Sequence, residues 1–309
     1  MILHTGNRTD IPAFYSKWFA GRLKDGYVLV RSPYNPSLVT RYEINKEVVD
    51  LMVFCTKNPS PMLPYMKALS PYSQYWFVTL TPYGNEIEPG IKDKNEVINA
   101  FRHLSGIVGP ENICWRYDPI FTDKTYTISY HMKAFEKICR LLSGYTNCCI
   151  ISFLDIYQKV RKNFPEACEV SMQDRLLLGK AIIDIGKRYN IKIKTCAEGT
   201  LLADAGADCS GCMTQKVFED AVGSRLILPK SFRPSRKECS CILSSDIGAY
   251  DTCANLCRYC YANSSAEAVI KNLKLHDPAS PLLIGHLMPE DKVVQAIQES
   301  WIDMQLSFL

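Results

Sequence analysis

Three cysteines near the C-terminal end of the sequence have the residue type and spacing that could bind a metal centre. Cys253, Cys257 and Cys260 are separated by three and then by two residues. A tight turn can bring three thiolates onto one iron–sulfur cube, since cysteine thiolates are the usual ligands of such clusters. Three protein ligands for four irons leave one iron open, and an open metal position is where a small molecule can bind and react. We therefore expect these three residues, here called the triplet, to hold a four-iron, four-sulfur cluster.

The triplet has two other interpretations, which the sequence leaves open. Together with Cys239 or Cys241 it could bind a tetrahedral zinc ion, as in four-thiolate structural sites. The three residues could also be buried thiols that bind nothing and pack as small hydrophobic side chains. The cluster is the favoured hypothesis, because three and then two intervening residues form an unusual spacing among zinc sites.

A second group of cysteines lies outside the triplet and could form another metal site. Cys196 follows a predicted strand, and Cys239 and Cys241 lie in the segment before the triplet. With Cys212 they make a four-thiolate set suited to an auxiliary iron–sulfur cluster for electron relay or to a structural zinc. Cys209 could replace Cys212, since both belong to the run Asp-Cys-Ser-Gly-Cys. Spacing this loose does not define geometry, so buried thiols without a metal are the open alternative.

The composition is that of an ordinary globular protein with an unusual number of cysteines. The 309 residues suffice for one large domain or two small ones, with 47% hydrophobic and 22% charged residues. The formal net charge of +4 is mild and no run of Lys and Arg is present, so nucleic acid is not indicated as a partner. We find no signal-peptide pattern and no membrane-spanning stretch. We therefore expect a cytoplasmic protein, in which 14 Cys indicate metal or redox chemistry rather than disulfides.

Short hydrophobic runs alternate with amphipathic helical patterns along the first 200 residues. This alternation predicts a parallel sheet with helical crossovers. At least six such units favour an α/β barrel similar to a TIM barrel, whether whole, partial or permuted. Strands are expected at 2–5, 48–54, 75–80, 112–115, 147–153 and 191–195, and helices at 12–23, 61–69, 95–107, 129–142 and 175–189. A hairpin is expected from residues 27–31 and 38–44.

From about residue 201 the helix and strand signals weaken and cysteines accumulate. Residues 201–309 are expected to form a cysteine-rich region that packs on the barrel mouth, in one structural unit with residues 1–200. Within this region we expect a loop at 229–237, a short strand within 242–247, a helix at 265–273 capped by Ser264, and a final amphipathic helix at 291–304.

Polar and charged side chains gather just after the predicted strands. Functional residues of such barrels lie at the C-terminal ends of the strands, so these side chains are expected to converge on one mouth. For any one of them the alternative stays open that strand ends are polar simply because loops begin there. The candidates are Arg8, Asp10, Lys57, Asn58, Thr79, Thr81, Arg116, Asp118, Asp155, Glu198 and Asp246.

Several longer runs of residues resemble the motifs of one known family. They are Asn-Arg-Thr-Asp-Ile-Pro-Ala-Phe at 7–14, Thr-Lys-Asn-Pro at 56–59, Thr-Pro-Tyr-Gly at 81–84, Trp-Arg-Tyr-Asp-Pro-Ile at 115–120, Asp-Ile-Gly-Ala-Tyr at 246–250 and Cys-Tyr-Ala-Asn at 260–263. In this order, and essentially end to end, they resemble the family called domain of unknown function 1848. That family is generally regarded as similar to the radical S-adenosylmethionine enzymes, with a cluster loop similar to that of spore photoproduct lyase.

The resemblance implies a cofactor. In radical S-adenosylmethionine enzymes the open iron binds the amino and carboxylate groups of S-adenosylmethionine. One electron from the cluster then cleaves the sulfonium to give a 5′-deoxyadenosyl radical. Two features depart from that superfamily. The cluster loop comes after the barrel strands rather than after the first strand, and the Gly-Gly-Glu-Pro run that usually holds the methionine amino group is missing.

Other residues must then hold the cofactor. Arg8, Lys57 or Arg116 is expected to bind its carboxylate as a charge-assisted pair. Ribose hydroxyls or the amino group are assigned to Asp10, Asp118 or Glu198, and Asn58 and Asp246 complete the set of candidate cofactor-binding residues.

These expectations lead to a radical enzyme whose substrate, a small molecule or a macromolecule, the sequence does not identify. Such an enzyme also needs an electron-donor protein as a partner. A non-catalytic protein, stabilised by zinc or by an iron–sulfur cluster and binding a ligand or nucleic acid, is the alternative. A nucleic-acid repair enzyme is a third hypothesis, by analogy with the lyase-like loop, and the mild charge argues against it.

Overall fold

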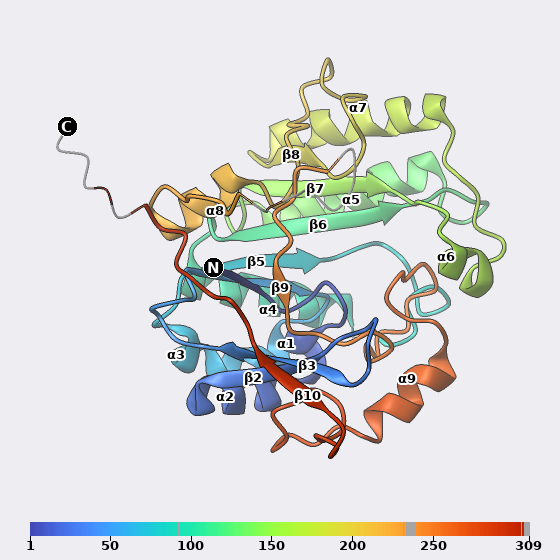
Figure 1. Ribbon diagram of the computed structural model, residues 1–309. Coiled ribbons are helices and arrows are strands. Elements are labelled where there is room, and N and C mark those ends of the chain that lie inside the picture. The colour runs from blue at the N-terminus through green and yellow to red at the C-terminus, as the bar shows by residue number, and fades with distance from the viewer. Residues whose placement is uncertain (92, 231, 233–238, 304, 306–309) are drawn as a thin grey trace.

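A seven-stranded sheet in which all paired strands are parallel forms the centre of the molecule (Figure 1). The structure, a computed structural model, describes residues 1–91, 93–230, 232, 239–303 and 305. The strands are β1 (Ile2–His4), β4 (Leu51–Thr56), β5 (Gln74–Thr79), β6 (Ile113–Ile120), β7 (Cys148–Phe153), β8 (Lys192–Thr195) and β9 (Ser245–Asp246). The predicted α/β fold with a parallel sheet is therefore confirmed.

The order of the strands in this sheet is β8-β7-β6-β5-β4-β1-β9. Each strand pairs with the next one of the series along the chain, except that β9, the last, pairs with β1, the first. Within the described ranges no pairing joins β8 to β9, so closure into a barrel is not shown. The predicted boundary near residue 200 stays a prediction.

Helices make the crossovers between consecutive strands, as the alternating pattern predicts. Three long helices have a side-chain cap at their N-terminus, where Asp93, Thr127 and Ser171 each accept a backbone N–H of the first turn. These helices are α4 (Lys94–Val108), α5 (Ile128–Leu142) and α7 (Met172–Arg188). Shorter helical segments are η1 (Ser60–Tyr65), α3 (Met66–Leu69) and α6 (Gln158–Asn163).

Stacked aromatic rings fill the space between this sheet and its helices. The rings of Phe54 and Trp76, on neighbouring strands, stack with their centroids 4.0 Å apart. Trp115 stacks on Phe135 of α5 with a centroid distance of 4.7 Å. All four side chains are fully buried, and rings of this size contribute a large share of the apolar area removed from water. The sheet is therefore a rigid base for the loops at its edges.

The helix predicted at residues 12–23 is present but divided. α1 (Ile11–Phe14) and α2 (Ser16–Asp25) meet at Tyr15. Asp10 caps α1 through the N–H of Ala13, and Gly26 ends α2 in the left-handed region with φ 76°.

A second sheet of three strands joins residues 27–43 to residues 292–295, near the other end of the chain. β2 (Tyr27–Arg31) and β3 (Leu38–Glu43) form the predicted antiparallel hairpin. The final helix predicted at 291–304 is wrong, because its first part is β10 (Lys292–Gln295), which lies parallel to β3 (Figure 1). The hairpin leaves the outer edge of β3 unpaired, and the β-branched pair Val293-Val294 is well suited to a strand. Residue 304 lies outside the described residues.

The C-terminal third contains more structure than the sequence indicates. α8 (Gln215–Val222), which was not predicted, contacts β4 and β5. α9 (Ala266–Leu273) is confirmed, but its cap is Ser265 rather than Ser264. Most of the loop predicted at 229–237 lies outside the described residues. In the part of the chain that the structure describes, every helix is too short or too polar to cross a membrane.

Candidate metal centre

A cavity of about 310 Å³ lies at the C-terminal ends of the parallel strands. Parallel strands present their carboxyl ends at one edge of a sheet, so the residues that follow them meet there. Both cysteine groups line this cavity, although they come from different parts of the chain. The seven candidate ligands on its wall are Cys196, Cys212, Cys239, Cys241, Cys253, Cys257 and Cys260.

The triplet occupies a tight turn after β9. Leu256 adopts a left-handed conformation with φ 51°, which is uncommon for a residue with a branched side chain and is strained. The backbone N–H of Cys260 donates to the carbonyl of Cys257 at 3.0 Å, and the side-chain amide of Asn263 donates to the carbonyl of Cys253 at 2.8 Å. These contacts fold the segment back on itself and hold its three thiols on the cavity wall.

The triplet turn is also bound to the segment at residues 84–91. The N–H of Arg258 donates to the carbonyl of Ile87 at 3.0 Å, and the N–H of Gly90 donates to the carbonyl of Asn255 at 2.9 Å. A Cβ at Gly90 would lie 2.1 Å from the carbonyl oxygen of Ala254. Glycine at position 90 therefore permits the close approach of the two segments.

The buried carboxylate of Glu88, in the segment at residues 84–91, links that segment to the triplet turn. Glu88 is fully buried and accepts from the Lys57 ammonium at 2.8 Å, the Thr81 hydroxyl at 2.6 Å, and Lys94. The hydroxyl of Tyr259, which lies between two cysteines of the triplet, also donates to Glu88 and accepts from Lys57 at 2.9 Å. The turn is thus attached to a charged network, while Cys257 and Tyr259 also pack in a small apolar cluster that includes Tyr83 and Ile87.

The charges of this network are matched. Burial opposes ionisation of Glu88, but the neighbouring Lys57 and Lys94 lower the pKa of its carboxyl to about 2. Burial likewise opposes the charge on Lys57, and Glu88 more than offsets it, so the pKa of Lys57 lies above its usual value. Burial raises the pKa of the Cys257 thiol to about 12, with Lys57 opposing that rise. A metal would have to displace the thiol protons on binding.

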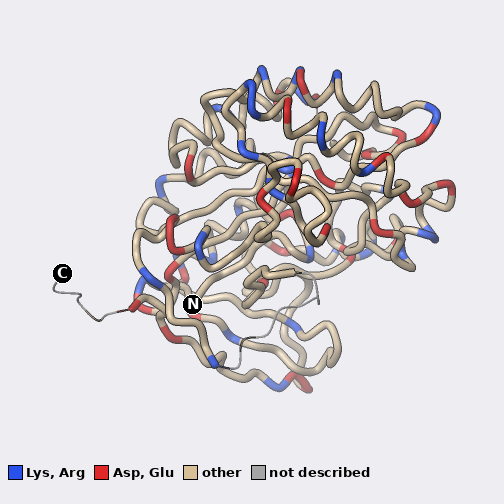
Figure 2. The backbone as a smooth tube through the Cα atoms, turned by 90° about the horizontal axis from the view of Figure 1, so that it is seen from above, with Lys and Arg blue, Asp and Glu red and all other residues tan. Residues whose placement is uncertain are grey.

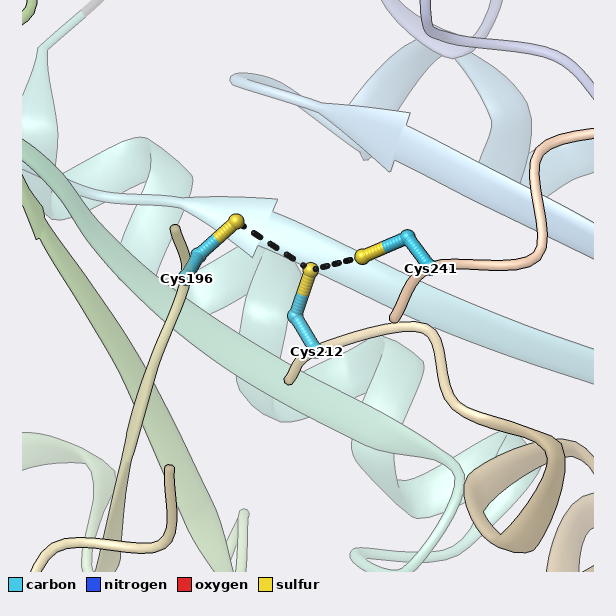
Figure 3. A group of neighbouring side chains, drawn as sticks. All are labelled: Cys196, Cys212 and Cys241. Atoms are coloured by element: carbon cyan, nitrogen blue, oxygen red, sulfur yellow. Dashed lines mark hydrogen bonds between the residues drawn. The ribbon is translucent and has the colours of Figure 1, made fainter. Parts of the chain in front are cut away.

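Three cysteines of the second group, here called the trio, point toward one another (Figure 3). The sulfur of Cys212 lies 3.5 Å from that of Cys196 and 3.1 Å from that of Cys241. All three sulfurs lie within 4.8 Å of one another. Among the described residues this is the one group of three or more Cys, His, Asp or Glu close enough to bind a single ion.

Backbone pairing brings the trio together from three segments. The N–H of Thr195 donates to Asp208 and the N–H of Asp208 donates to Ile193, so the 208–212 loop lies along the end of β8. The N–H of Ile242 donates to the carbonyl of Met213 at 2.8 Å, which holds Cys241 beside Cys212. Gly211 has φ 109°, a conformation that glycine adopts freely and that turns the chain just before Cys212.

The remaining cysteines of this region are placed differently. Cys239 lines the cavity and accepts the backbone N–H of Cys241 at its sulfur, 3.4 Å away, but it does not belong to the group within 4.8 Å. Cys209 lies on a small neighbouring pocket instead, so of the two candidates in the Asp-Cys-Ser-Gly-Cys run it is Cys212 that joins the trio. Cys55, at the end of β4, lines the main cavity as well.

Four of the eight predicted cofactor-binding residues line the cavity. Arg116 donates from Nε to Asp118 at 2.8 Å, and Nη2 donates to the same carboxylate oxygen. Ser152 donates to the other oxygen of Asp118 at 2.7 Å. Burial opposes the charge on Arg116, yet Asp118 and then the cysteines Cys212 and Cys196 raise its pKa. The four on the wall are Asp10, Lys57, Arg116 and Asp118.

Asp10 lies on the wall but already makes several hydrogen bonds. Its Oδ1 accepts from Ala13, and its Oδ2 accepts from the backbone N–H of Lys57 at 2.8 Å and from the side chain of Asn255 at 3.0 Å. It thereby connects the ends of β1 and β4 to the triplet turn. Burial raises its pKa, with these donors opposing the rise.

The other four predicted residues are not among those that line the cavity. Asp246 accepts the backbone N–H groups of Asn7 and Gly248, each at 2.8 Å, and lies 4.0 Å from Arg8. Asn58 accepts the N–H of Ser60 at 3.1 Å in a local turn. Glu198 accepts from Phe153 and Arg175, and burial raises its pKa to about 7. These contacts support the loops around the cavity.

Sequence reasoning missed several residues of the site. Glu88 stands in a loop between Ile87 and Pro89 with no pattern that indicates its role. Asn255 and Ser152 orient two of the carboxylates on the wall, Asp10 and Asp118. Tyr259 directly precedes the last cysteine of the triplet, but its bond to Glu88 joins residues 171 positions apart, which no local pattern indicates.

The charged residues are spread along the molecule. Figure 2 shows Lys and Arg interspersed with Asp and Glu along the backbone, in keeping with the mild net charge.

Comparisons with known proteins give a family but no reaction. The profile of the family described as domain of unknown function (DUF1848) matches residues 2–262. No curated protein matches the chain. One crystal structure, of a protein from Bacteroides thetaiotaomicron provisionally described as an alpha-L-fucosidase, aligns with 57% of this chain and 84% of that one. Its sequence identity is 10% and its TM-score is 0.30, too low to carry any argument.

Proposed function

Because this chain belongs to the DUF1848 family, whose description assigns no reaction, we propose its function from the site itself: a radical S-adenosylmethionine enzyme. Cys253, Cys257 and Cys260 would bind a four-iron, four-sulfur cluster, and S-adenosylmethionine would occupy the open iron. The substrate would lie in the same cavity.

One observation carries this proposal. The three thiols of the triplet lie on the wall of a cavity that charged side chains from several strand ends also line. A cluster bound at this position would have its open iron on the side of the cavity, where a small charged cofactor fits. A buried, closed metal site would offer no such space.

The triplet suits a cluster better than a single ion. Its sulfurs are not among the groups that lie within 4.8 Å of one another, and the ligands of a cluster bind different irons and so stand further apart. The backbone N–H of Ala262 donates to the sulfur of Cys260 at 3.3 Å, and such donors stabilise thiolates bound to iron. The ammonium of Lys57 favours the charged forms of Cys257 and Cys260.

When bound, the cluster would supply the electron that cleaves S-adenosylmethionine. The chain's own residues would bind and orient that cofactor. We assign its carboxylate to Nη1 of Arg116, because Nε and Nη2 of this guanidinium both donate to Asp118. Lys57 is committed to Glu88 and Tyr259, and Arg8 is not among the residues of the cavity wall, so both are weaker candidates.

The order of the strands supports a partial, permuted barrel. In the radical enzymes the cluster loop follows the first barrel strand, whereas here it follows β9, the last strand of the sheet along the chain. Yet β9 lies at the edge of the sheet beside β1, and from that edge the strands run β9-β1-β4-β5-β6-β7-β8. In space, the triplet therefore follows the first strand of this series. A circular permutation accounts for its late position in the sequence.

A non-catalytic protein stabilised by zinc is the second candidate function. The close sulfurs of Cys196, Cys212 and Cys241 favour it, since a single ion with thiolate ligands needs no reaction to explain it. The two candidates differ in what the triplet binds and in whether the cofactor is cleaved.

An anaerobic reconstitution tests the proposed function. Wild type, Cys257→Ala and Cys168→Ala are loaded with iron and sulfide, reduced and incubated with S-adenosylmethionine, and 5′-deoxyadenosine is measured. Cys168 is exposed and is not among the residues that line the cavity, so its variant is the matched control. We expect product from wild type and from the control, and none from Cys257→Ala.

Two results would contradict the proposal. One is a wild type that takes up zinc at the triplet and no iron, which favours the non-catalytic protein. The other is equal production of 5′-deoxyadenosine by Cys257→Ala, which would place the chemistry outside the triplet.

A further inference from the structure

The trio has the dimensions of a site for one metal ion. A tetrahedral zinc ion with zinc–sulfur bonds of about 2.3 Å separates its thiolates by about 3.8 Å. The sulfur of Cys212 lies 3.5 Å from that of Cys196 and 3.1 Å from that of Cys241, and all three sulfurs lie within 4.8 Å of one another. Dashed lines mark these two contacts in Figure 3. Small shifts of the side chains would bring all three sulfurs onto one ion.

These distances favour an ion over a second iron–sulfur cluster. Ligands of a cube bind separate irons, so their sulfurs cannot approach as closely as those of the trio. Soft thiolate ligands select zinc or copper(I) among the single ions, and three thiolates on a tetrahedral ion leave one position for another ligand.

The fourth position faces the cavity. Cys239, the nearest further cysteine in sequence, stands outside the group of sulfurs that lie within 4.8 Å of one another. The trio itself lines the cavity. The Arg116 guanidinium interacts with Cys196 and Cys212, so an anionic ligand at the fourth position would be stabilised.

From this geometry we infer that Cys196, Cys212 and Cys241 bind one zinc ion whose fourth position is open to the cavity and accepts an anionic ligand such as a thiolate. This site goes beyond the proposed function, because it does not require a cluster at the triplet. A metal with three protein ligands and one open position is typical of sites that bind or activate a small molecule rather than of structural sites.

Cobalt binding tests the inference, because cobalt(II) absorbs in the visible range when thiolates bind it tetrahedrally. The protein is stripped of metal under a phosphine reductant and titrated with cobalt(II), and zinc is then used to displace it. The titration is made on a variant with Cys253, Cys257 and Cys260 all replaced by Ala, so that the triplet cannot contribute. We expect one equivalent of cobalt with thiolate charge-transfer absorption, and we expect zinc to displace it.

Two single variants in this background identify the ligands. Cys212→Ser should lose the cobalt equivalent, whereas Cys209→Ser, in the same loop and outside the trio, should keep it. Cys239→Ser should keep it as well. Adding 2-mercaptoethanol should change the cobalt absorption, because its thiolate would enter the open position.

Each opposite result overturns the inference. Unchanged cobalt binding in Cys212→Ser would exclude the trio as the site, and loss of cobalt in Cys239→Ser would mean a closed four-thiolate site. Uptake of iron and sulfide by the triplet-free protein, lost in Cys212→Ser, would mean a cluster instead of zinc. If the triplet-free protein does not fold, the three single variants are made in the wild-type chain instead. Cys212→Ser should then bind one equivalent of cobalt less than wild type, and the other two should bind as much as wild type. Failure of the radical reaction alone leaves all these readouts unaffected.

Discussion

The two cysteine groups reach the same cavity by different routes. The triplet comes from one turn at residues 253–260, whereas the trio joins three segments whose cysteines are 16 and 29 positions apart. A local group needs only its own turn to be held in place, because its spacing already brings the ligands together. A group from distant segments exists only when the sheet and its loops are folded. The position of the triplet therefore depends on its contacts with residues 84–91, whereas the position of the trio depends on the sheet itself.

The surroundings of the two groups differ in the same way. The triplet lies against a charged network of Glu88, Lys57 and Tyr259. The trio lies beside the ion pair between Arg116 and Asp118, both of which belong to β6. Changes to the network should therefore affect the triplet and leave the trio unchanged.

The largest effect is expected from Glu88→Gln. The change leaves two ammonium groups beside an uncharged amide, and removing one partner of a buried ion pair costs about 3–5 kcal/mol. We expect urea unfolding to show this loss, and the iron content of the reconstituted triplet to fall while the trio keeps its cobalt equivalent. Glu86→Gln is the control, because Glu86 is exposed and the amide oxygen of Gln can still accept from the Tyr126 hydroxyl, so the change should cost less than about 1.5 kcal/mol. Equal stability of the two variants would mean that the network does not support the turn.

The second prediction concerns the sheet beneath the trio and its dependence on pH. His4 is buried, and neither ring nitrogen has a hydrogen-bond partner in the described part of the chain. Burial lowers its pKa to about 4, which the nearby backbone of Ile242 only partly opposes. The unfolded chain, with a pKa of about 6.5, binds more protons between these values, so stability is full above pH 6.5 and falls as the pH drops to 4.

This pH dependence amounts to roughly 3 kcal/mol, and His4→Leu should remove it. The measurement is urea unfolding of the metal-free protein at a series of pH values. His103→Leu, on the exposed side of α4, should keep the slope of the wild type. A slope that persists in His4→Leu would assign the pH dependence to other groups.

A smaller effect is expected from Tyr259→Phe. The variant removes a hydroxyl that bonds to Lys57 and Glu88, but these two groups stay paired with each other, so we expect a loss of about 1.5–3 kcal/mol in all. Tyr261→Phe loses one bond, of 2.6 Å, to the carbonyl of Asn7 at a half-exposed site, and should cost about 0.5–1.5 kcal/mol. Urea unfolding compares the two, and the iron content of the triplet should fall only in Tyr259→Phe. The reverse order would show that the tyrosine outside the triplet supports the turn more strongly.

The smallest change in chemistry is a single methyl group at Gly90. Its Cβ would overlap the carbonyl oxygen of Ala254, and forced overpacking costs about 1–3 kcal/mol. Gly90→Ala should therefore displace the triplet turn and reduce its iron content without changing cobalt binding at the trio. Gly106→Ala, in α4 with open space around it, should instead stabilise by up to about 1 kcal/mol. Loss of cobalt in Gly90→Ala would contradict the independence of the two groups.

Much of the fold follows from patterns among residues that are close along the sequence. The predicted strands and helices up to residue 195 are present, the helix at 12–23 in two segments, whereas α6 has no predicted counterpart. β10 shows the limit of such patterns. Its residues also fit a helix, and the unpaired edge of β3, more than 250 positions earlier, makes them a strand. α8 is a different case, because it carries local helix signals: Thr214 caps it and Gly223 ends it with φ 72°, and it was not predicted.

The sequence by itself determined the triplet and the alternation that produces a parallel sheet, because both depend on the spacing of residues close along the chain. Only the tertiary structure decided that Cys212 rather than Cys209 joins the trio, and that Glu88 accepts a hydrogen bond from Tyr259. It also decided that both cysteine groups share one cavity. The physical reason is that a buried charge or thiol interacts with residues that the folded sheet brings close in space. Their separation along the sequence does not indicate these distances.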